Sequence, residues 1–494
     1  MHDPAPHPAL SATTLARVLD GWSAGPAPLY RSLAGAVVAA VERGDVPRGT
    51  RLPAERAAAA ALAVARGTVV AAYDLLAASG VVERRRGSGT WVVDEDAPEL
   101  RLHELAAGLR ARQLTRDTLA GGGVVDLALS VLPTAADLPR DAFRLDVVEL
   151  DRVAHGHGYH PSGLPELRER LAALHCDHGV PTTPDQVVVT GGAQQAVALT
   201  ARLLIHPGDV VAVESPTYPG AIDAYSRAGA RFATVAGDGA GVLPDDVGRV
   251  LAAHDPRAVY VVPSAHNPRG TVLPDHRRRA LAALAEEHDT WLVEDECLAW
   301  AVYGLDGPPL PVAAHGHDRR VLTIGSLSKV LWGGLRLGWI RGPAPAVARL
   351  GRLKAAADLG NCAVSQALTL GLFDRIPAIA AERRRGLAAG AETLCALLAA
   401  ALPDWQVRPP DGGLSLWVRL PDATGDAFAP VALRHGVRVL PGSAASPDEA
   451  DLDHLRLAVS PPPARLRLAV DRLAAAWAEF TGAGRPGVAA AAAG

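Results

Sequence analysis

The sequence predicts two folded parts: an N-terminal winged helix-turn-helix, and a larger C-terminal α/β domain with a mostly parallel sheet and a small α/β subdomain. Three observations support this organisation. Helical patterns and a basic, glycine-bearing ribbon occupy residues 27–93, a charged and glycine-containing stretch follows at 94–123, and short apolar runs alternate with helical stretches over 124–480. A chain of 494 residues has room for several domains at roughly 100–200 residues each.

The remaining boundaries follow from composition. Residues 1–26 are rich in proline, alanine and histidine and predict a flexible tail, residues 94–123 a linker, and residues 481–494 a frayed end. The small subdomain is expected at about 380–480, where a helical stretch precedes two β-rich pieces.

The overall composition indicates a soluble, cytoplasmic protein. Apolar residues make up 49% of the chain and charged residues 21%, which suits a buried core. No uncharged apolar run reaches the roughly 18 residues of a membrane span, and the first residues lack an apolar signal core, so no membrane partner is expected. The four cysteines are too scattered for a zinc ribbon or a disulfide framework, and we expect no metal site.

Each helix and strand of the N-terminal part is predicted by a local sequence pattern. Apolar residues fall on one face of a helix over Tyr30–Arg43, Pro53 opens a second helix near Glu55–Leu62, and Gly80 ends a third. Alternation over Val81–Val93 predicts a two-stranded ribbon.

The N-terminal part is basic within an acidic chain. Residues 29–93 hold nine arginines and five acidic residues, a net charge of +4, whereas the whole chain carries −4. Such an excess suits phosphate neutralisation, with Arg66, Gly67 and Thr68 at the start of the third helix facing base edges. From composition alone, a dimerisation domain with a solvated basic face is an equally good interpretation.

In the C-terminal part, short apolar runs predict the strands of the sheet: Gln186–Thr190, Val210–Glu214, Ala258–Val262, Trp291–Asp295, Val321–Ile324 and Gly338–Arg341. The small subdomain is expected to contribute Gly413–Leu420 and His454–Val459.

Lysine is scarce in this chain, since only Lys329 and Lys354 occur among 49 basic residues. Lys329 ends Ser326-Leu327-Ser328-Lys329 after a predicted strand, and Arg336 follows seven residues later. A lysine that forms a Schiff base with pyridoxal phosphate needs phosphate ligands nearby, which two hydroxyls and an arginine can supply. The alternative is a surface lysine in a polar loop, which the scarcity of lysine and the flanking apolar strands disfavour.

Two other motifs suit the same cofactor. Asp295 ends a strand, where a carboxylate can keep the pyridine nitrogen protonated; a solvated aspartate is an equal alternative before context. Thr190-Gly191-Gly192-Ala193-Gln194 joins a strand to a helix, whose first N–H groups can bind phosphate. This loop lacks the G-x-G-x-x-G spacing of a dinucleotide site.

The N-terminal motifs resemble the GntR-type winged helix: Gly49-Thr50-Arg51-Leu52-Pro53-Ala54-Glu55-Arg56, Arg66-Gly67-Thr68-Val69 and Gly87-Ser88-Gly89-Thr90. The resemblance implies operator DNA as a partner. It implies DNA contacts at Arg51, Arg56, Arg66, Gly67, Thr68, Arg85, Gly87 and Gly89. Ala65 departs from the family, which commonly has serine there, and loses a potential helix cap.

From about Tyr159 to Ser460, the C-terminal motifs resemble the fold-type I aminotransferases of class I and II. The resemblance implies a pyridoxal phosphate-dependent transferase fold in which Lys329 forms the Schiff base and Asp295 contacts the pyridine nitrogen. It implies that Tyr218 stacks on the ring, Asn267 binds the ring oxygen and Arg456 clamps an amino acid's carboxylate. The implied phosphate ligands are Gly192, Ala193, Gln194, Ser326, Ser328 and Arg336.

One position departs from this family. A tyrosine that donates to the ring oxygen usually stands two residues after the aspartate, where this chain has Cys297. A thiol is a poor hydrogen-bond donor, so we expect catalysis to suffer more than cofactor binding.

A GntR-like winged helix, a linker and an aminotransferase-like module in one chain resemble the MocR/PdxR-type regulators. This resemblance implies a head-to-tail homodimer that controls operator DNA and senses pyridoxal phosphate, or an amine or amino-acid effector that forms an aldimine. The main alternative is an active aminotransferase with an accessory DNA-binding domain. A third interpretation is a DNA-binding protein whose cofactor site is vestigial.

Overall fold

The computed structural model describes residues 9–19, 22, 29–78, 81–85, 89–93, 123–132, 138, 144–145, 147–316, 318–448 and 450–482. The chain divides into two compact units, residues 1–120 and 121–494. Most of the predicted linker 94–123, Gly87 of the predicted ribbon and residues beyond 482 lie outside the described residues.

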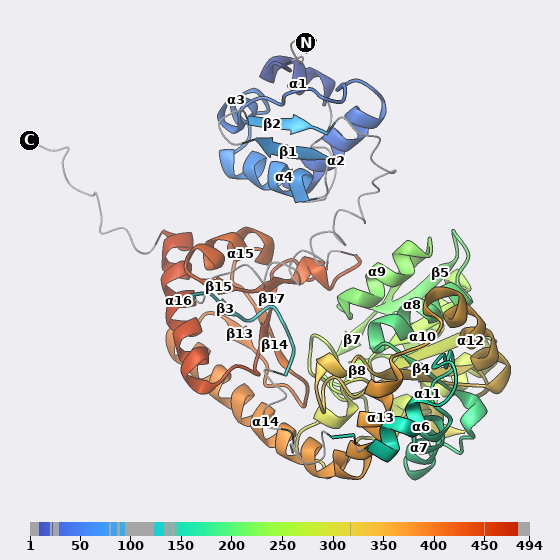
Figure 1. Cartoon of the computed structure of the whole chain (residues 1–494). Coiled ribbons are helices and arrows are strands. Elements are labelled where there is room, and N and C mark those ends of the chain that lie inside the picture. The colour runs from blue at the N-terminus through green and yellow to red at the C-terminus, as the bar shows by residue number, and fades with distance from the viewer. Residues whose placement is uncertain are drawn as a thin grey trace, which may run out of the picture. The chain divides into compact units, whose positions relative to one another are not determined.

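The first unit contains the three predicted helices and the ribbon (Figure 1). The helices are α2 (Leu29–Glu42), α3 (Glu55–Ala61) and α4 (Arg66–Ala78), and the antiparallel strands are β1 (Val82–Arg85) and β2 (Gly89–Val92). The apolar faces of the helices meet in one core around Leu33, Val37, Val69 and Leu76. The fold prediction for this unit, a winged helix-turn-helix, is confirmed.

The predicted tail 1–26 is not wholly irregular. It contains the helix α1 (Ala12–Val18), in which the Ser11 hydroxyl accepts a hydrogen bond from the Thr14 N–H at 3.0 Å. Leu15 and Leu19 are buried in the core of the first unit. The sequence did not reveal this helix because seven residues span only two turns, too few to establish a helical period.

The second unit is built on a seven-stranded sheet in the order β4-β12-β11-β10-β9-β5-β6. Only β12 runs antiparallel to its neighbours in this sheet, so the predicted mostly parallel sheet is confirmed. The strands are β4 (Val187–Thr190), β5 (Val210–Glu214), β6 (Arg231–Val235), β9 (Ala258–Val261), β10 (Trp291–Asp295), β11 (Val321–Ser326) and β12 (Gly338–Arg341).

Helices cover both faces of this sheet, which explains why its strands are continuous apolar runs. Val188 packs in one cluster with α8 and α12, whereas its neighbours Val187 and Val189 pack in another with α7. The helices are α6 (Val147–Ala154), α7 (Pro165–Asp177), α8 (Ala193–Leu204), α9 (Pro219–Arg227), α10 (Pro244–His254), α11 (Asp275–Glu287), α12 (Ala344–Asp358) and α13 (Ala363–Leu372). β6 was not predicted, because its residues are only partly buried at the sheet edge.

The small subdomain has its own sheet, in the order β13-β14-β17-β16. Its strands are β13 (Gln406–Val407), β14 (Ser415–Arg419), β16 (Leu440–Pro441) and β17 (His454–Ala458), and its helices are α14 (Ile376–Ala401), α15 (Gly425–Arg434) and α16 (Pro463–Thr481). β3 (Val125–Asp126), from the start of the unit, pairs in parallel with β15 (Val437–Arg438). The small subdomain therefore includes a segment far outside the predicted range of about 380–480.

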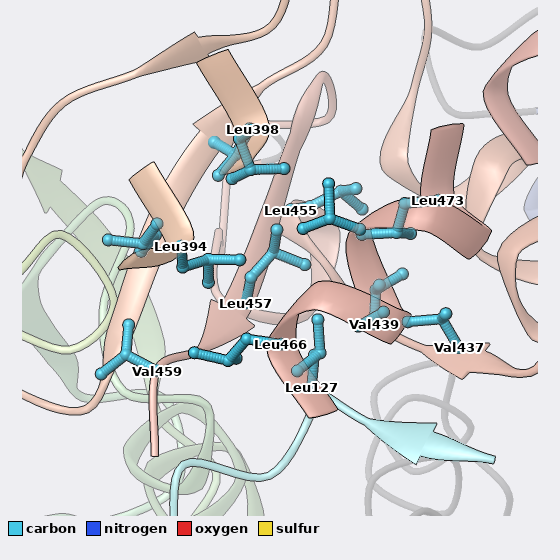
Figure 2. Close-up of a cluster of buried hydrophobic side chains, with 14 of the residues drawn as sticks. Leu127, Leu394, Leu398, Val437, Val439, Leu455, Leu457, Val459, Leu466 and Leu473 are labelled. Atoms are coloured by element: carbon cyan, nitrogen blue, oxygen red, sulfur yellow. The ribbon is translucent and has the colours of Figure 1, made fainter. Parts of the chain in front are cut away.

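Figure 2 shows the apolar core that joins these pieces. Leu127 from the first segment packs with Leu394 of α14, Leu457 of β17 and Leu466 of α16, all of them almost fully buried. In the described part of the chain, no single helix is long and apolar enough to cross a membrane; α3 and α4 pass that test only as a pair bent by 119°.

Leu457→Ala should lower the free energy of unfolding by about 2–5 kcal/mol, because the Leu457 side chain is fully buried and truncation leaves a cavity. The matched control is Leu433→Ala on α15, where the side chain is 41% exposed and the expected change is within about 0.5 kcal/mol. Urea unfolding followed by tryptophan fluorescence measures both; equal losses would contradict the assignment of the core.

Candidate functional site

The candidate site lies at the carboxyl ends of β10 and β11, where ligands commonly bind in α/β sheets. Asp295 is the last residue of β10, and Lys329 lies in the loop that follows β11. The Lys329 ammonium donates a hydrogen bond to the carbonyl of Ser130. Burial, reinforced by the positive charge of Arg456, lowers the pKa of Lys329 to about 8, although Cys297 and Asp295 act in the opposite direction. The site therefore favours a neutral, nucleophilic amine far more than water does.

Asp295 is buried and held by two donors. The hydroxyl of Tyr260, on the adjacent strand β9, donates to one carboxylate oxygen at 2.7 Å, and the backbone N–H of Cys297 donates to the other at 3.0 Å. Burial and the nearby carboxylate raise the pKa of Tyr260 well above its usual value. Sequence reasoning missed Tyr260; the available signal was a hydroxyl-bearing residue inside an otherwise aliphatic strand beside Asp295.

The predicted phosphate loop is shaped around a guanidinium group. Gly192 is the N-cap of α8 with φ +105°, and a Cβ built there would lie 3.2 Å from Nη2 of Arg336. Arg336 donates to the carbonyl of Gly191 at 2.6 Å. The Ser326 hydroxyl lies 3.1 Å from that of Ser328, in the loop after β11. A helix N-terminus and an arginine therefore meet at one place, which suits an anion.

A hydrogen-bond network that the sequence did not reveal contacts this loop. Lys354 donates to both carboxylate oxygens of Asp358, at 2.7 and 2.8 Å, and is fully buried. Asp358 in turn accepts from the Gln195 side chain at 2.6 Å, and Gln195 accepts from the Gly191 N–H at 2.6 Å. Lys354, the second lysine of the chain, is thus linked to the Gly191 loop through Asp358 and Gln195. Within the described residues, its ammonium group is engaged in an ion pair, unlike that of Lys329.

Tyr218 and Gln194 face one another at the start of two helices. The Tyr218 hydroxyl donates to the Gln194 carbonyl oxygen at 2.8 Å, and the Gln194 amide donates to the carbonyl of Gly220 at 2.9 Å. Burial, with Asp295 and Cys297 nearby, raises the pKa of Tyr218. The structure therefore brings Tyr218 and the Gly191 loop together, with Asp295 close by.

Arg456 joins the small subdomain to the large domain. It lies on β17 and donates to the Asn267 side chain at 3.0 Å and to the carbonyl of Ala128 at 2.5 Å. Burial lowers the pKa of Arg456 to about 10. Its Nε is buried without a hydrogen-bond partner among the described residues, so a donor remains available for an acceptor from outside the chain.

Cys297 is buried beside the same carboxylate. Burial, with a further contribution from Asp295, raises the pKa of its thiol well above the usual value. Cys297 is thus a neutral thiol and a weak hydrogen-bond donor. It stands where the resembling family usually has a tyrosine hydroxyl.

Three of the predicted DNA-contacting arginines, Arg51, Arg56 and Arg66, are exposed. Arg51 lies over the Trp91 ring and beside Gly89, Arg56 is on the surface of α3, and Arg66 is 63% exposed at the start of α4. Gly67 is exposed with open space around its Cα, and Thr68 is partly exposed. The backbone of Arg85 ends β1, whereas its side chain and Gly87 lie outside the described parts.

Glu55 pairs with two of the arginines in this region. One carboxylate oxygen lies 3.2 Å from Arg66, and the other lies 3.4 Å from Arg84. Sequence reasoning did not assign Glu55 a role, although it stands within the Arg51–Arg56 motif. Ala65, before α4, has no side-chain oxygen to cap the helix.

These residues fit pyridoxal phosphate. A Cβ at Gly192 would crowd Arg336, the Lys329 amine is buried in the loop after β11, and the Asp295 carboxylate is held by two donors. Within the described residues, no group of three or more histidine, cysteine or acidic side chains is arranged to hold a metal ion. The fold and the site together define the class of fold-type I aminotransferases, joined here to a winged helix.

Comparisons with known proteins identify the family. The sequence model of "Aminotransferase class I and II" matches residues 134–473, and that of "Bacterial regulatory proteins, gntR family" matches residues 29–92. The chain is 32% identical over 402 residues to the HTH-type pyridoxine biosynthesis transcriptional regulator PdxR of Corynebacterium glutamicum, covering 81% of this chain and 84% of that one. It is 32% identical over 333 residues to the probable rhizopine catabolism regulatory protein MocR of Rhizobium meliloti, covering 63% and 65%.

Solved structures agree on the fold. LysN, an α-aminoadipate aminotransferase of Thermus thermophilus solved with N-(5'-phosphopyridoxyl)-L-leucine, matches with a TM-score of 0.68 and 25% identity, over 76% of this chain and 95% of its own. An archaeal alanine:glyoxylate aminotransferase matches with a TM-score of 0.68 and 28% identity, over the same shares. The chain belongs to the MocR/PdxR-type transcriptional regulators, which combine a GntR DNA-binding domain with an aminotransferase-like domain.

In protein freed of any cofactor, the rate at which Lys329 captures the aldehyde of pyridoxal phosphate should rise between pH 7 and 9, with a midpoint of about 8. The reason is that only the neutral amine attacks, and its fraction grows as pH passes the pKa. Arg456→Gln should move the midpoint to higher pH, because removing the nearby positive charge raises the pKa of Lys329. Stopped-flow absorption at a series of pH values measures both; a midpoint near 10 in the unaltered protein would contradict the prediction.

Proposed function

We propose that this protein is a pyridoxal phosphate-dependent transcription regulator in which an amine or amino acid, or the cofactor itself, controls binding to operator DNA. The observation that carries the proposal is a buried lysine with a depressed pKa, set beside a buried arginine with a spare donor, in a chain that also contains a winged helix. Regulators of this DNA-binding family act on operator DNA in bacterial cells, so we place the protein in the cytoplasm.

In this proposal, Lys329 is the covalent attachment point of the cofactor. The phosphate of the cofactor is bound by the start of α8 and by side chains near the end of β11: Gly192, Ala193, Gln194, Ser326, Ser328 and Arg336. Asp295, which Tyr260 orients, binds the pyridine nitrogen. Tyr218 covers the ring and Asn267 binds the ring oxygen. When bound, pyridoxal phosphate supplies an electrophilic carbon that the amine of an effector can attack.

Arg456 is the proposed carboxylate clamp. Its Nε has no partner among the described residues, whereas its two Nη groups bond Asn267 and Ala128. A carboxylate held by two parallel hydrogen bonds therefore displaces one of these partners. A ligand that only binds can regulate, because a difference in affinity for two states of the protein is sufficient.

We propose that turnover is at most residual. Cys297 carries a neutral thiol of raised pKa where a hydroxyl donor would polarise the cofactor's ring oxygen, so proton transfer at the effector's α-carbon is poorly supported. The second candidate function is an active aminotransferase, and the presence of Lys329, Asp295, Asn267 and Arg456 in one site favours it.

We further propose a head-to-tail homodimer. Val147 and Val148 on α6 are 74% and 76% exposed, and Tyr159 and Leu359 are 58% and 54% exposed, which is unusual for large apolar side chains. A dimer would place two winged helices on paired half-sites. The predicted domain division, 27–93 for DNA and 124–480 for the effector, with the linker 94–123 between them, suits repositioning of the DNA-binding part.

Arg66→Ala should weaken binding to a specific operator by about 1–3 kcal/mol and relax its sequence preference, because Arg66 is exposed at the start of the proposed recognition helix. The matched control is Arg43→Ala, a similarly exposed arginine paired with Asp45 at the end of α2, which should change little. Gel-shift titrations with specific and scrambled DNA at two salt concentrations measure both. Equal, sequence-independent losses in the two variants would rule out base recognition by Arg66.

An effector should change operator affinity about 5- to 150-fold, the range of a typical coupling of 1–3 kcal/mol. The measurement is operator affinity with and without pyridoxal phosphate and a panel of amines and amino acids, together with 2-oxo acid-dependent turnover on the same sample. Lys329→Ala should abolish both the borohydride-trapped adduct and the effector response. Turnover on the order of 10 per second without any effect on DNA binding would establish the enzyme instead.

A further inference from the structure

A second cleft lies between the large domain and the small subdomain, lined by residues other than those of the proposed cofactor site. Its volume is about 660 Å³, within the roughly 300–1,000 Å³ common for small-molecule sites. The large domain contributes Arg269 and the hairpin of β7 (Gly237–Asp238) and β8 (Gly241–Val242), and the small subdomain contributes β13, β14 and β17.

One wall of the cleft is aromatic. The rings of Trp417 and His454, on neighbouring strands, stack with centroids 5.1 Å apart and planes 12° apart. The indole N–H of Trp417 is buried without a hydrogen-bond partner among the described residues. This wall offers a flat aromatic surface, which suits a planar ligand.

Two guanidinium groups of the cleft have no close carboxylate partner among the described residues. Arg269 donates only to the carbonyls of Ser215 and Gly237, at 3.1 and 3.5 Å, and has no carboxylate partner in the described part of the chain. Arg408 lies 3.7 Å from Asp411 with both side chains about half exposed, so its pairing is weak. Both guanidinium groups contact the β7–β8 hairpin, at Gly237 and Gly239, where a Cβ would approach them to 3.3 and 2.5 Å.

The acidic residues of the cleft already have partners. Asp238 binds Arg277 at 2.7 and 2.8 Å, and Asp453 binds Arg419 at 2.6 Å. Asp451 accepts from the Ser446 hydroxyl at 3.1 Å. Asp453 and Asp451 also lie 2.6 and 3.6 Å from Nδ1 of His454. None of the three carboxylates contacts Arg269 or Arg408, so these two guanidinium groups can bind an anion from outside.

We propose that this cleft is a binding site for an aromatic carboxylate, with the carboxylate on Arg408 and Arg269 and the ring against Trp417 and His454. Trp417 stands opposite Arg456 in the β14–β17 register. Arg456 donates to the side chain of Asn267, and Arg269 comes two residues after Asn267. A ligand in the cleft thus contacts Trp417, which is paired with Arg456, and Arg269, which is close to Asn267 in the chain. Binding stands without the proposed function; only its use as a second regulatory input rests on that function.

The test is calorimetric titration of the full-length protein with indole-3-acetate, a probe that has no amine and cannot condense with an aldehyde at Lys329. Arg408→Gln should weaken binding about 10- to 100-fold, as expected for the loss of one charge-assisted hydrogen bond. Replacing the probe by the neutral indole-3-acetamide should weaken binding by a similar factor, and Trp417→Leu should also weaken it.

Two controls locate the site. Arg434→Gln, at an exposed arginine on α15 that pairs with Glu479 away from the cleft, should leave binding unchanged. If Arg408→Gln has no effect while Arg456→Gln abolishes binding, the probe occupies the proposed effector site and the inference is overturned. Absence of binding at millimolar probe, or equal binding of the acid and the amide, would overturn it too. Effector-induced changes in DNA binding test the proposed function separately.

Discussion

The second unit depends on the burial of one carboxylate, that of Asp295. A carboxylate removed from water is costly unless hydrogen bonds replace its hydration, and here they come from Tyr260 on the adjacent strand and from the backbone after β10. Both donors reach it only because β9 and β10 are paired in parallel and the chain turns immediately after Asp295. The hydrogen bonds to Asp295 therefore depend on the same strand register that sets the position of the site. Lys329 lies in the loop after β11, the next strand of the sheet, which pairs with β10 in parallel.

Arg456 has a comparable role between the two parts of the unit. One guanidinium bonds a side chain of the large domain and a carbonyl of the segment that leads from β3. Arg456 thus contacts segments that lie 189 and 328 residues before it in the chain. A group in this position is well suited to transmit occupancy of the site, because any change in its partners alters how the small subdomain packs against the large domain.

Much of this could be predicted from the sequence, for local reasons. The buried strands were visible because β9 and the first three residues of β10 are apolar, and Lys329 was visible because lysine is scarce. Supporting contacts were not visible, because they depend on residues distant in the chain: Tyr260 reaches Asp295 across a sheet, and Lys354 reaches Gly191 through Asp358 and Gln195. The helix α1 and the strand β3 are too short to show a period, so only packing reveals them. The roles assigned to the site residues remain predictions.

The pairing of Glu55 with Arg66 and Arg84 has a consequence for how a winged helix finds its target. In the proposed function, a DNA phosphate competes with the Glu55 carboxylate for Arg66 and Arg84, so it gains less from each of them than from an arginine without such a partner. Binding to random sequence is then weaker. The cost of breaking the ion pairs with Glu55 is offset only where base edges add hydrogen bonds to the phosphate contacts. An acid within a basic surface therefore shortens the time lost on the many wrong sites of a genome, at the expense of some affinity for the right one.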